Sequence, residues 1–205
     1  MFNDVLTPDG ALIFPKLKNF NGYYMAGGTA MALQMEHRIS VDFDFFSDKK
    51  IAGTLFNEIK KTFPKSQISV LVNNRDEFTV VIDNVKVTFL TYPFKIVRDL
   101  AKIEGLPMLS IPELAATKAY TIGRRRELKD YVDLYFALAG NYVKLPDIIE
   151  IATQKYSDVF NARLFLEQLV SISEIPDVEI TFLKPAPGKE EMQSFFISET
   201  KKISL

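Results

Sequence analysis

The sequence has 205 residues and a formal net charge of −1, with 47% hydrophobic and 25% charged residues, as in an ordinary globular protein. It contains no cysteine, which excludes disulfides, thiolate nucleophiles, zinc ribbons and iron–sulfur clusters. The single histidine, His37, excludes a multi-histidine metal site. Carboxylates, cations and hydroxyls remain for chemistry, and they favour a hard, oxygen-ligated ion such as Mg²⁺ if a metal is used.

The charge balance and the N-terminus limit the partners and the location of the protein. A net charge near zero argues against a globally basic nucleic-acid binder but leaves room for a local basic patch. The N-terminus lacks a basic segment followed by an apolar stretch, so we expect no signal peptide. No apolar run approaches the ~20 residues that span a bilayer. We therefore expect a cytoplasmic protein.

Short strand-like segments dominate the first 110 residues. A strand predicted at 23–26 ends at a Gly27-Gly28 turn, and a short helix follows at 29–36 with Thr29 as its N-cap. Segment 40–46 alternates polar and apolar residues, with Val41, Phe43 and Phe45 on the apolar face, which predicts another strand. The remaining elements expected in this half are a helix at 52–63, strands at about 67–73, 77–83 and 85–91, and a tight hairpin at Asp83-Asn84.

After residue 110 the hydrophobic period changes from that of strands to that of helices. Four helices are predicted, at 111–123, 127–139, 146–156 and 162–171, followed by a strand at about 178–183 and a helical tail. The fold class is therefore α/β (α+β). We expect an N-terminal α/β unit at 1–110 and a mainly helical unit at 111–205 packed on it.

The glycine turn and the two aspartates that follow it form the most informative pattern. Gly27 and Gly28, between a strand and a helix, allow a bound group to approach the backbone, and a helix N-terminus offers free N–H donors to an anion. Asp42 and Asp44 project to the same side of a strand, where their charges repel each other unless a cation lies between them. Each pattern alone is usually a tight turn or a solvated sheet edge, but their combination favours a divalent ion that bridges the aspartates to a nucleoside triphosphate.

Gly27-Gly28-Thr29 followed by Asp42-x-Asp44 resembles the nucleotidyltransferase superfamily related to DNA polymerase β. More narrowly, segments 26–30 and 37–46 are similar to the AbiEii/AbiGii toxin-type nucleotidyltransferases. Segment 129–135 matches the C-terminal helical motif of that family, and Lys118 occupies its preceding lysine position. The resemblance covers about residues 22–140 and implies a nucleotidyltransferase-fold core with a mixed sheet.

The resemblance implies Mg²⁺-dependent transfer of a nucleotide from an NTP to an RNA such as a tRNA 3′ end, or to a protein hydroxyl. The protein would be the toxin of a toxin–antitoxin or phage-defence pair, with a cognate antitoxin protein as partner. Asp42 and Asp44 would be catalytic and hold Mg²⁺. The residues that would bind the nucleotide near the glycine turn are Gly27, Gly28, Thr29, Arg38 and Ser40.

The helical motif has two interpretations. Lys129, Asp130 and Asp133 either form ordinary ion pairs on a helix, or face the cleft together with Lys118. Under the resemblance, Lys118 and Asp133 are catalytic, Asp133 serving as a candidate base, and Lys129 and Asp130 bind nucleotide.

One position departs from the superfamily pattern, in which many members carry a third carboxylate on a later strand. The corresponding strand here, 86–91, offers Thr88 and no acid, and Thr88 would share a face with Lys86 and Leu90. A threonine cannot accept a proton near neutral pH. Either another group acts as base, the acceptor needs none, or the protein is a catalytically impaired nucleotide- or partner-binding module; a nucleotide-independent RNA- or protein-binding domain is a weaker alternative.

Three further features carry open expectations. Arg124-Arg125-Arg126 is either a solvated turn between helices or a patch that steers an RNA end or a triphosphate. His37 is expected to be a turn residue that hydrogen-bonds locally. Phe195-Phe196, in a polar tail, docks either on the chain's own surface or on a partner.

Overall fold

The computed structural model describes residues 4–203. Its strands are β1 Tyr24–Ala26, β2 Phe43–Ser47, β3 Ile68–Asn73, β4 Glu77–Ile82, β5 Val85–Thr91, β6 Ala101–Ile103 and β7 Leu106–Met108. Within the described residues they form one seven-stranded sheet in the order β3-β4-β5-β2-β1-β7-β6. β2 runs parallel to β5 and β1 runs parallel to β7, whereas the other neighbours are antiparallel. The mixed sheet confirms the predicted α/β class.

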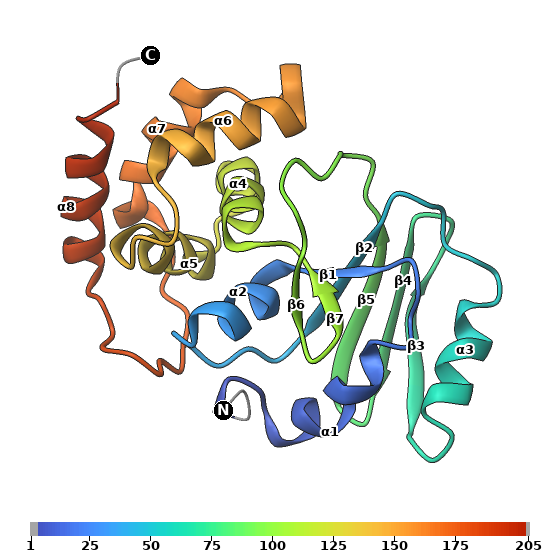
Figure 1. Cartoon of the computed structure of the whole chain (residues 1–205). Helices are drawn as coiled ribbons and strands as arrows, with labels where there is room; N and C mark the ends of the chain where they lie inside the picture. The colour runs from blue at the N-terminus through green and yellow to red at the C-terminus, as the bar shows by residue number, and fades with distance from the viewer. Residues whose placement is uncertain (1–3, 204–205) are drawn as a thin grey trace.

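Helices flank the sheet and make up most of the C-terminal half (Figure 1). The α-helices are α1 Pro8–Leu17, α2 Gly27–Met35, α3 Leu55–Thr62, α4 Ile111–Thr121, α5 Leu128–Ala139, α6 Leu145–Tyr156, α7 Ala162–Val170 and α8 Lys189–Thr200. Figure 1 shows α4 and α5 beside α2, α6 to α8 beyond them, and α1 and α3 on the side of the sheet near β3 to β5. No helix in the described part of the chain is long and apolar enough to cross a membrane.

Local signals explain where several elements begin and end. Pro112 lies in the first turn of α4, where its missing N–H is not needed. α5 ends at Gly140, and Asn141 follows in the left-handed conformation with a φ of 55°. Asp83 and Asn84 both have positive φ, which matches the twist of the hairpin between β4 and β5. The predicted hairpin and both helices are confirmed.

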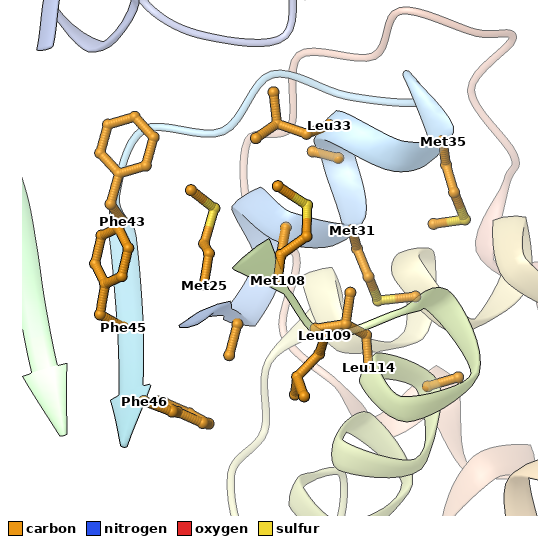
Figure 2. Close-up of a cluster of buried hydrophobic side chains, with 14 of the residues drawn as sticks. Met25, Met31, Leu33, Met35, Phe43, Phe45, Phe46, Met108, Leu109 and Leu114 are labelled. Carbon is orange, nitrogen blue, oxygen red and sulfur yellow. The ribbon is translucent and has the colours of Figure 1, made fainter. Parts of the chain in front are cut away.

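A continuous hydrophobic core joins the sheet to the helices on both sides. α1 and α3 cover one face, with Phe14 of α1 stacked on Phe43 at 6.1 Å between ring centroids. Met25 of β1, Met31 of α2 and Leu114 of α4 belong to the buried cluster in Figure 2, which links the sheet to the helices. This packing fixes β1, β2 and α2 relative to α4.

Three sequence expectations are wrong in detail. α2 begins at Gly27 with Ala26 as its N-cap, so Thr29 lies inside the first turn and is not the cap. The predicted strand at 178–183 is reduced to one isolated bridge between Arg38 and Phe182. β2 starts only at Phe43, and Val41 is 49% exposed instead of facing the core.

The structure also decides one open alternative and adds elements that the sequence did not suggest. Phe196 of α8 is fully buried and packs near Tyr131 and Tyr135 of α5, so this aromatic pair docks on the chain's own surface. α1, β6 and β7 were not predicted.

Candidate active site

A cavity of about 290 Å³ lies where the start of α2 meets segment 38–44, β5, α4 and α5. Its walls are formed by Gly28, Thr29, Arg38, Ile39, Ser40, Val41, Asp42, Asp44, Lys86, Lys118, Arg125, Glu127, Lys129 and Asp130. The structure thus brings together the predicted site residues of both sequence segments. Gly27 and Asp133 are the two that do not line this cavity.

Both glycines of the turn lie against charged side chains. Ala26 of β1 lies opposite Asp44 of β2, which places the turn directly beside the aspartate. Gly27 has a φ of +69°, and a Cβ there would collide with the Asp44 carboxylate. At Gly28 a Cβ would lie 2.5 Å from Nη2 of Arg38. The glycines therefore let Asp44 and Arg38 lie against the backbone.

The N-terminus of α2 faces this region with its backbone donors free of a side-chain cap. Ala26, its N-cap, has no side chain that accepts a hydrogen bond. The first turn of a helix exposes N–H groups and carries a partial positive charge, which suits an anion such as a phosphate.

Two buried hydroxyls fasten the loop that carries Asp42. The Oγ1 of Thr29 lies 2.7 Å from the Oγ of Ser40, and the Thr29 hydroxyl also donates to the backbone carbonyl of Asp42. Since both hydroxyls are buried and engaged with the loop, they hold Asp42 at the cavity wall.

The two aspartates differ in exposure and in partners. Asp42 is 39% exposed, and its Oδ2 lies 2.9 Å from Nζ of Lys86. Burial, followed by the negative charge of Asp42, raises the pKa of Asp44 above its usual range. The hydrogen bond to Asp42 raises the pKa of Lys86, so the lysine is charged at neutral pH. A cation bound between the aspartates would relieve the cost of ionising Asp44.

Thr88 occupies the position where the superfamily pattern leads one to expect an acid. It lies directly opposite Asp44 in the parallel pair of β2 and β5. Among residues 4–203, no three His, Cys, Asp or Glu side chains are grouped to hold a metal. Asp42 and Asp44 alone still fit Mg²⁺, because this ion commonly binds through one or two carboxylates plus substrate phosphates.

Asp133 lies beneath the cavity at the centre of a buried charge cluster. It is fully buried and accepts two hydrogen bonds from Arg38, at 2.8 and 3.0 Å. Nζ of Lys118 lies 2.8 Å away, and Nε2 of His37 lies at the same distance. Burial opposes its ionisation, but Lys118 and Arg38 hold the pKa of Asp133 well below its usual range. Such a carboxylate is a poor base and a strong anchor for cations.

Asp130 extends this cluster towards the cavity. Lys118 bridges Asp130, at 2.5 Å, and Asp133, while Arg125 forms two hydrogen bonds of 2.8 Å to Asp130.

The expectation of a locally bonded His37 is wrong, because its partner Asp133 is 96 residues away in the sequence.

The three consecutive arginines at 124–126 make different contacts. Arg124 stacks on Tyr120, with 3.7 Å between its guanidinium carbon and the ring centroid, and Arg126 donates to the carbonyl of Glu174. Arg125 is the member of the run that lines the cavity. Lys86 is a further cation of the cavity for which no function is predicted from the sequence. Its position two residues before Thr88 on one strand places it on the same face of the sheet as Thr88.

Known proteins show the same fold and family. A family model described as "Nucleotidyl transferase AbiEii toxin, Type IV TA system" matches residues 13–104 and 79–198. The Aquifex aeolicus protein aq_aa25, uncharacterized by name, is 26% identical over 184 residues, which cover 89% of this chain and 88% of that protein.

Two solved structures also resemble the chain. A crystal structure of a candidate nucleotidyltransferase from H. pylori superposes with a TM-score of 0.63 at 18% identity, covering 94% of this chain and 93% of the other. MenT4, a nucleotidyltransferase toxin from Mycobacterium tuberculosis, superposes with a TM-score of 0.53 at 14% identity, covering 88% and 76%. These structures show a nucleotidyltransferase fold. Together with the family match over most of its length, they show that the chain belongs to the AbiEii nucleotidyltransferase toxin family.

Proposed function

We propose that this protein is a Mg²⁺-dependent nucleotidyltransferase that transfers a nucleotide from an NTP to an RNA acceptor, such as a tRNA 3′ end. The observation that carries the proposal is the cavity that joins Asp42 and Asp44 to the glycine turn and to cations from several elements. A triphosphate needs both parts, because its oxygens bind a divalent ion and its negative charge requires cationic walls.

Each group has a role that follows from its position. Asp42 and Asp44 would hold Mg²⁺, which when bound neutralises charge on the triphosphate. Gly27, Gly28 and Thr29 belong to the turn and first helical turn that cradle phosphate oxygens through backbone N–H groups. The side chains that add positive charge to the same phosphates are Arg38, Lys118, Arg125 and Lys129. Ser40 supports this site through its hydrogen bond with Thr29, which holds the loop of Asp42.

Asp133 and Asp130 act through the cations that they hold. Asp133 fixes the guanidinium of Arg38 and the ammonium of Lys118, and Asp130 fixes Lys118 and Arg125. We therefore assign Asp133 a positioning role and not that of the base.

The reaction is an in-line displacement at the α-phosphorus. An acceptor hydroxyl oxygen forms a bond to the α-phosphorus, the bond to the bridging oxygen breaks, and pyrophosphate and one proton leave. Catalysis of this kind depends chiefly on positioning and electrostatic stabilisation. The low pKa of Asp133 and the threonine opposite Asp44 favour an acceptor whose proton passes to solvent.

RNA is the acceptor that the charge distribution favours, since Arg125 and Lys129 border the cavity and Arg124 and Arg126 flank Arg125 in the chain. A protein hydroxyl is the other acceptor. We further propose that residues 1–110 carry the nucleotidyltransferase core, that 111–205 close the cleft with α4 and α5, and that a cytoplasmic antitoxin protein is the cognate partner.

The test is incubation of the protein with Mg²⁺, each α-labelled NTP in turn, and total RNA or lysate protein. We expect label in RNA with the wild type and none with Asp42→Asn. Label in protein instead would overturn the RNA acceptor, and absence of label in every combination would overturn the transferase proposal.

The pairing of Asp44 with Thr88 favours a second candidate, a nucleotide-binding module that no longer catalyses transfer. Calorimetry with a Mg²⁺–NTP separates the two functions in combination with the labelling assay. Binding without turnover supports the module, whereas binding with label transfer supports the enzyme.

A further inference from the structure

Lys86 and Asp42 form an ion pair at the place where the sheet brings β5 beside β2. Phe43 pairs with Val87 and Asp44 pairs with Thr88 in the parallel register, so the next step along the strands sets Lys86 beside Asp42. Nζ of Lys86 lies 2.9 Å from Oδ2 of Asp42, and both residues line the cavity. One face of the sheet thus pairs one aspartate with a lysine and the other with a threonine.

This pairing changes the charge available for divalent ions. Asp42, Asp44 and Lys86 together carry a formal charge of −1, which one divalent ion brings to +1. A set of three carboxylates reaches the same +1 only with two divalent ions, which is the arrangement that clamps both reacting oxygens in two-metal sites. The ammonium of Lys86 therefore supplies the positive charge that a second ion would bring.

The ligand supply leads to the same conclusion. Glu127 and Asp130 also line the cavity, but in the part of the chain that the structure describes no third carboxylate or histidine is grouped with Asp42 and Asp44 to hold a metal. The hydroxyl of Thr88 is buried and lies 3.4 Å from that of Thr79, towards the far side from β2. A second ion would thus compete with Lys86 for Asp42 and would gain no further carboxylate from the described residues in exchange.

We propose that Lys86 is a built-in cation that replaces a second divalent ion, so that the protein works as a one-ion nucleotidyltransferase. This inference rests on the proposed function and deepens it. Lys86 remains beside Asp42 when nucleotide binds, and its ammonium faces the cavity where the acceptor and the α-phosphate would meet.

The experiment counts bound ions directly. Mn²⁺ is titrated into the full chain in the presence of a saturating NTP analogue that cannot be cleaved between its α- and β-phosphates, and free Mn²⁺ is followed by its EPR signal. The variants are Lys86→Met, the double variant Lys86→Met/Thr88→Asp, and Lys129→Met as a matched control. The control removes one lysine charge from the same cavity without touching the Asp42 pair.

We expect one Mn²⁺ per wild-type complex and per Lys129→Met complex, and two per complex of the double variant. In Lys86→Met we expect the second ion to bind about tenfold or more tightly than in the wild type, because a unit charge has been removed a few ångströms away. The double variant adds a third carboxylate beside the two aspartates, so it shows whether the assay can count a second ion in this cavity.

Two results contradict the inference and leave the proposed function intact. One is a wild-type complex that binds two ions with similar affinity. The other is an equal gain of the second ion in Lys129→Met and Lys86→Met, which would mean that general cavity charge, and not the place of Lys86, decides the number. Absence of Mn²⁺–nucleotide binding in all variants overturns the inference together with the proposed function.

Discussion

Replacing Asp133 with asparagine separates a structural anchor from a group that touches substrate. The change keeps the shape of the side chain but removes the negative charge that faces Arg38, Lys118 and His37 in a fully buried setting. Removing one partner of a buried ion pair costs about 3–5 kcal/mol, since the remaining charges stay buried without compensation. In a chain of this size each kcal/mol lowers the melting temperature by about 2–4 °C, so we expect a loss of roughly 6–20 °C.

The assay is urea unfolding and thermal denaturation of Asp133→Asn beside Asp42→Asn. Asp42 is 39% exposed and its partner Lys86 is 45% exposed, so this pair contributes only about 0–1 kcal/mol. We expect Asp42→Asn to unfold almost as the wild type does while it loses transferase activity. Asp133→Asn should unfold much earlier, and any residual activity is measured well below its melting temperature.

A wild-type melting temperature for Asp133→Asn would refute the reasoning. It would mean that Arg38 and Lys118 reach water or another acceptor when Asp133 is neutral. Loss of activity with unchanged stability would indicate that Asp133 acts as the base. That result would contradict its assignment as a positioning residue.

The remaining predictions concern the turn, a second ion pair and pH. Gly28→Ala should weaken NTP binding in calorimetry, because the added Cβ would displace the guanidinium of Arg38. Alanine is the better helix former by about 1 kcal/mol, so weaker binding would result from the collision with Arg38 and not from a less stable helix. Glu113→Gln should lower the free energy of unfolding by about 3–5 kcal/mol in urea, since Lys155 then stays buried without its 2.6 Å partner, and NTP affinity should be unchanged below the melting temperature. The pKa of Asp133 in the folded state is below its unfolded value of about 3.9. The ionised carboxylate therefore stabilises the fold fully above the unfolded pKa, and this contribution is lost as the pH falls towards the folded pKa. Urea midpoints measured from pH 7 to pH 3 should fall more steeply in the wild type than in Asp133→Asn.

Local signals in the sequence were sufficient for much of the fold. The hairpin at Asp83-Asn84, the start of α4 at Pro112 and the end of α5 at Gly140 depend on backbone conformations that these residues favour within a few positions. The local signals for α1 conflict: Thr7 caps its N-terminus, but Pro15 lies inside it and normally argues against a helix.

The errors arise where a distant partner decides the local structure. Thr29 has the side chain of an N-cap, but its hydroxyl bonds to Ser40, and the extended conformation of Ala26 starts the helix earlier. Segment 178–183 alternates like a strand, yet apart from the bridge at Phe182 it gains no neighbour with which to form a ladder.

The main residues of the candidate site could be predicted from the sequence, but the contacts between them could not. The glycine turn and the two aspartates follow one another in the sequence, and the family resemblance associated them with Lys118 and segment 129–135. The bond of His37 to Asp133 and the pairing of Lys86 with Asp42 depend on tertiary packing, so no local pattern reveals them.

The most direct test of the central claim is transfer of label from an α-labelled NTP in the presence of Mg²⁺ and total RNA. We expect label in RNA with the wild-type protein and none with Asp42→Asn, whose stability should match that of the wild type. Equal labelling by the two proteins, or no labelling by a wild-type protein that is shown to be folded, would contradict it.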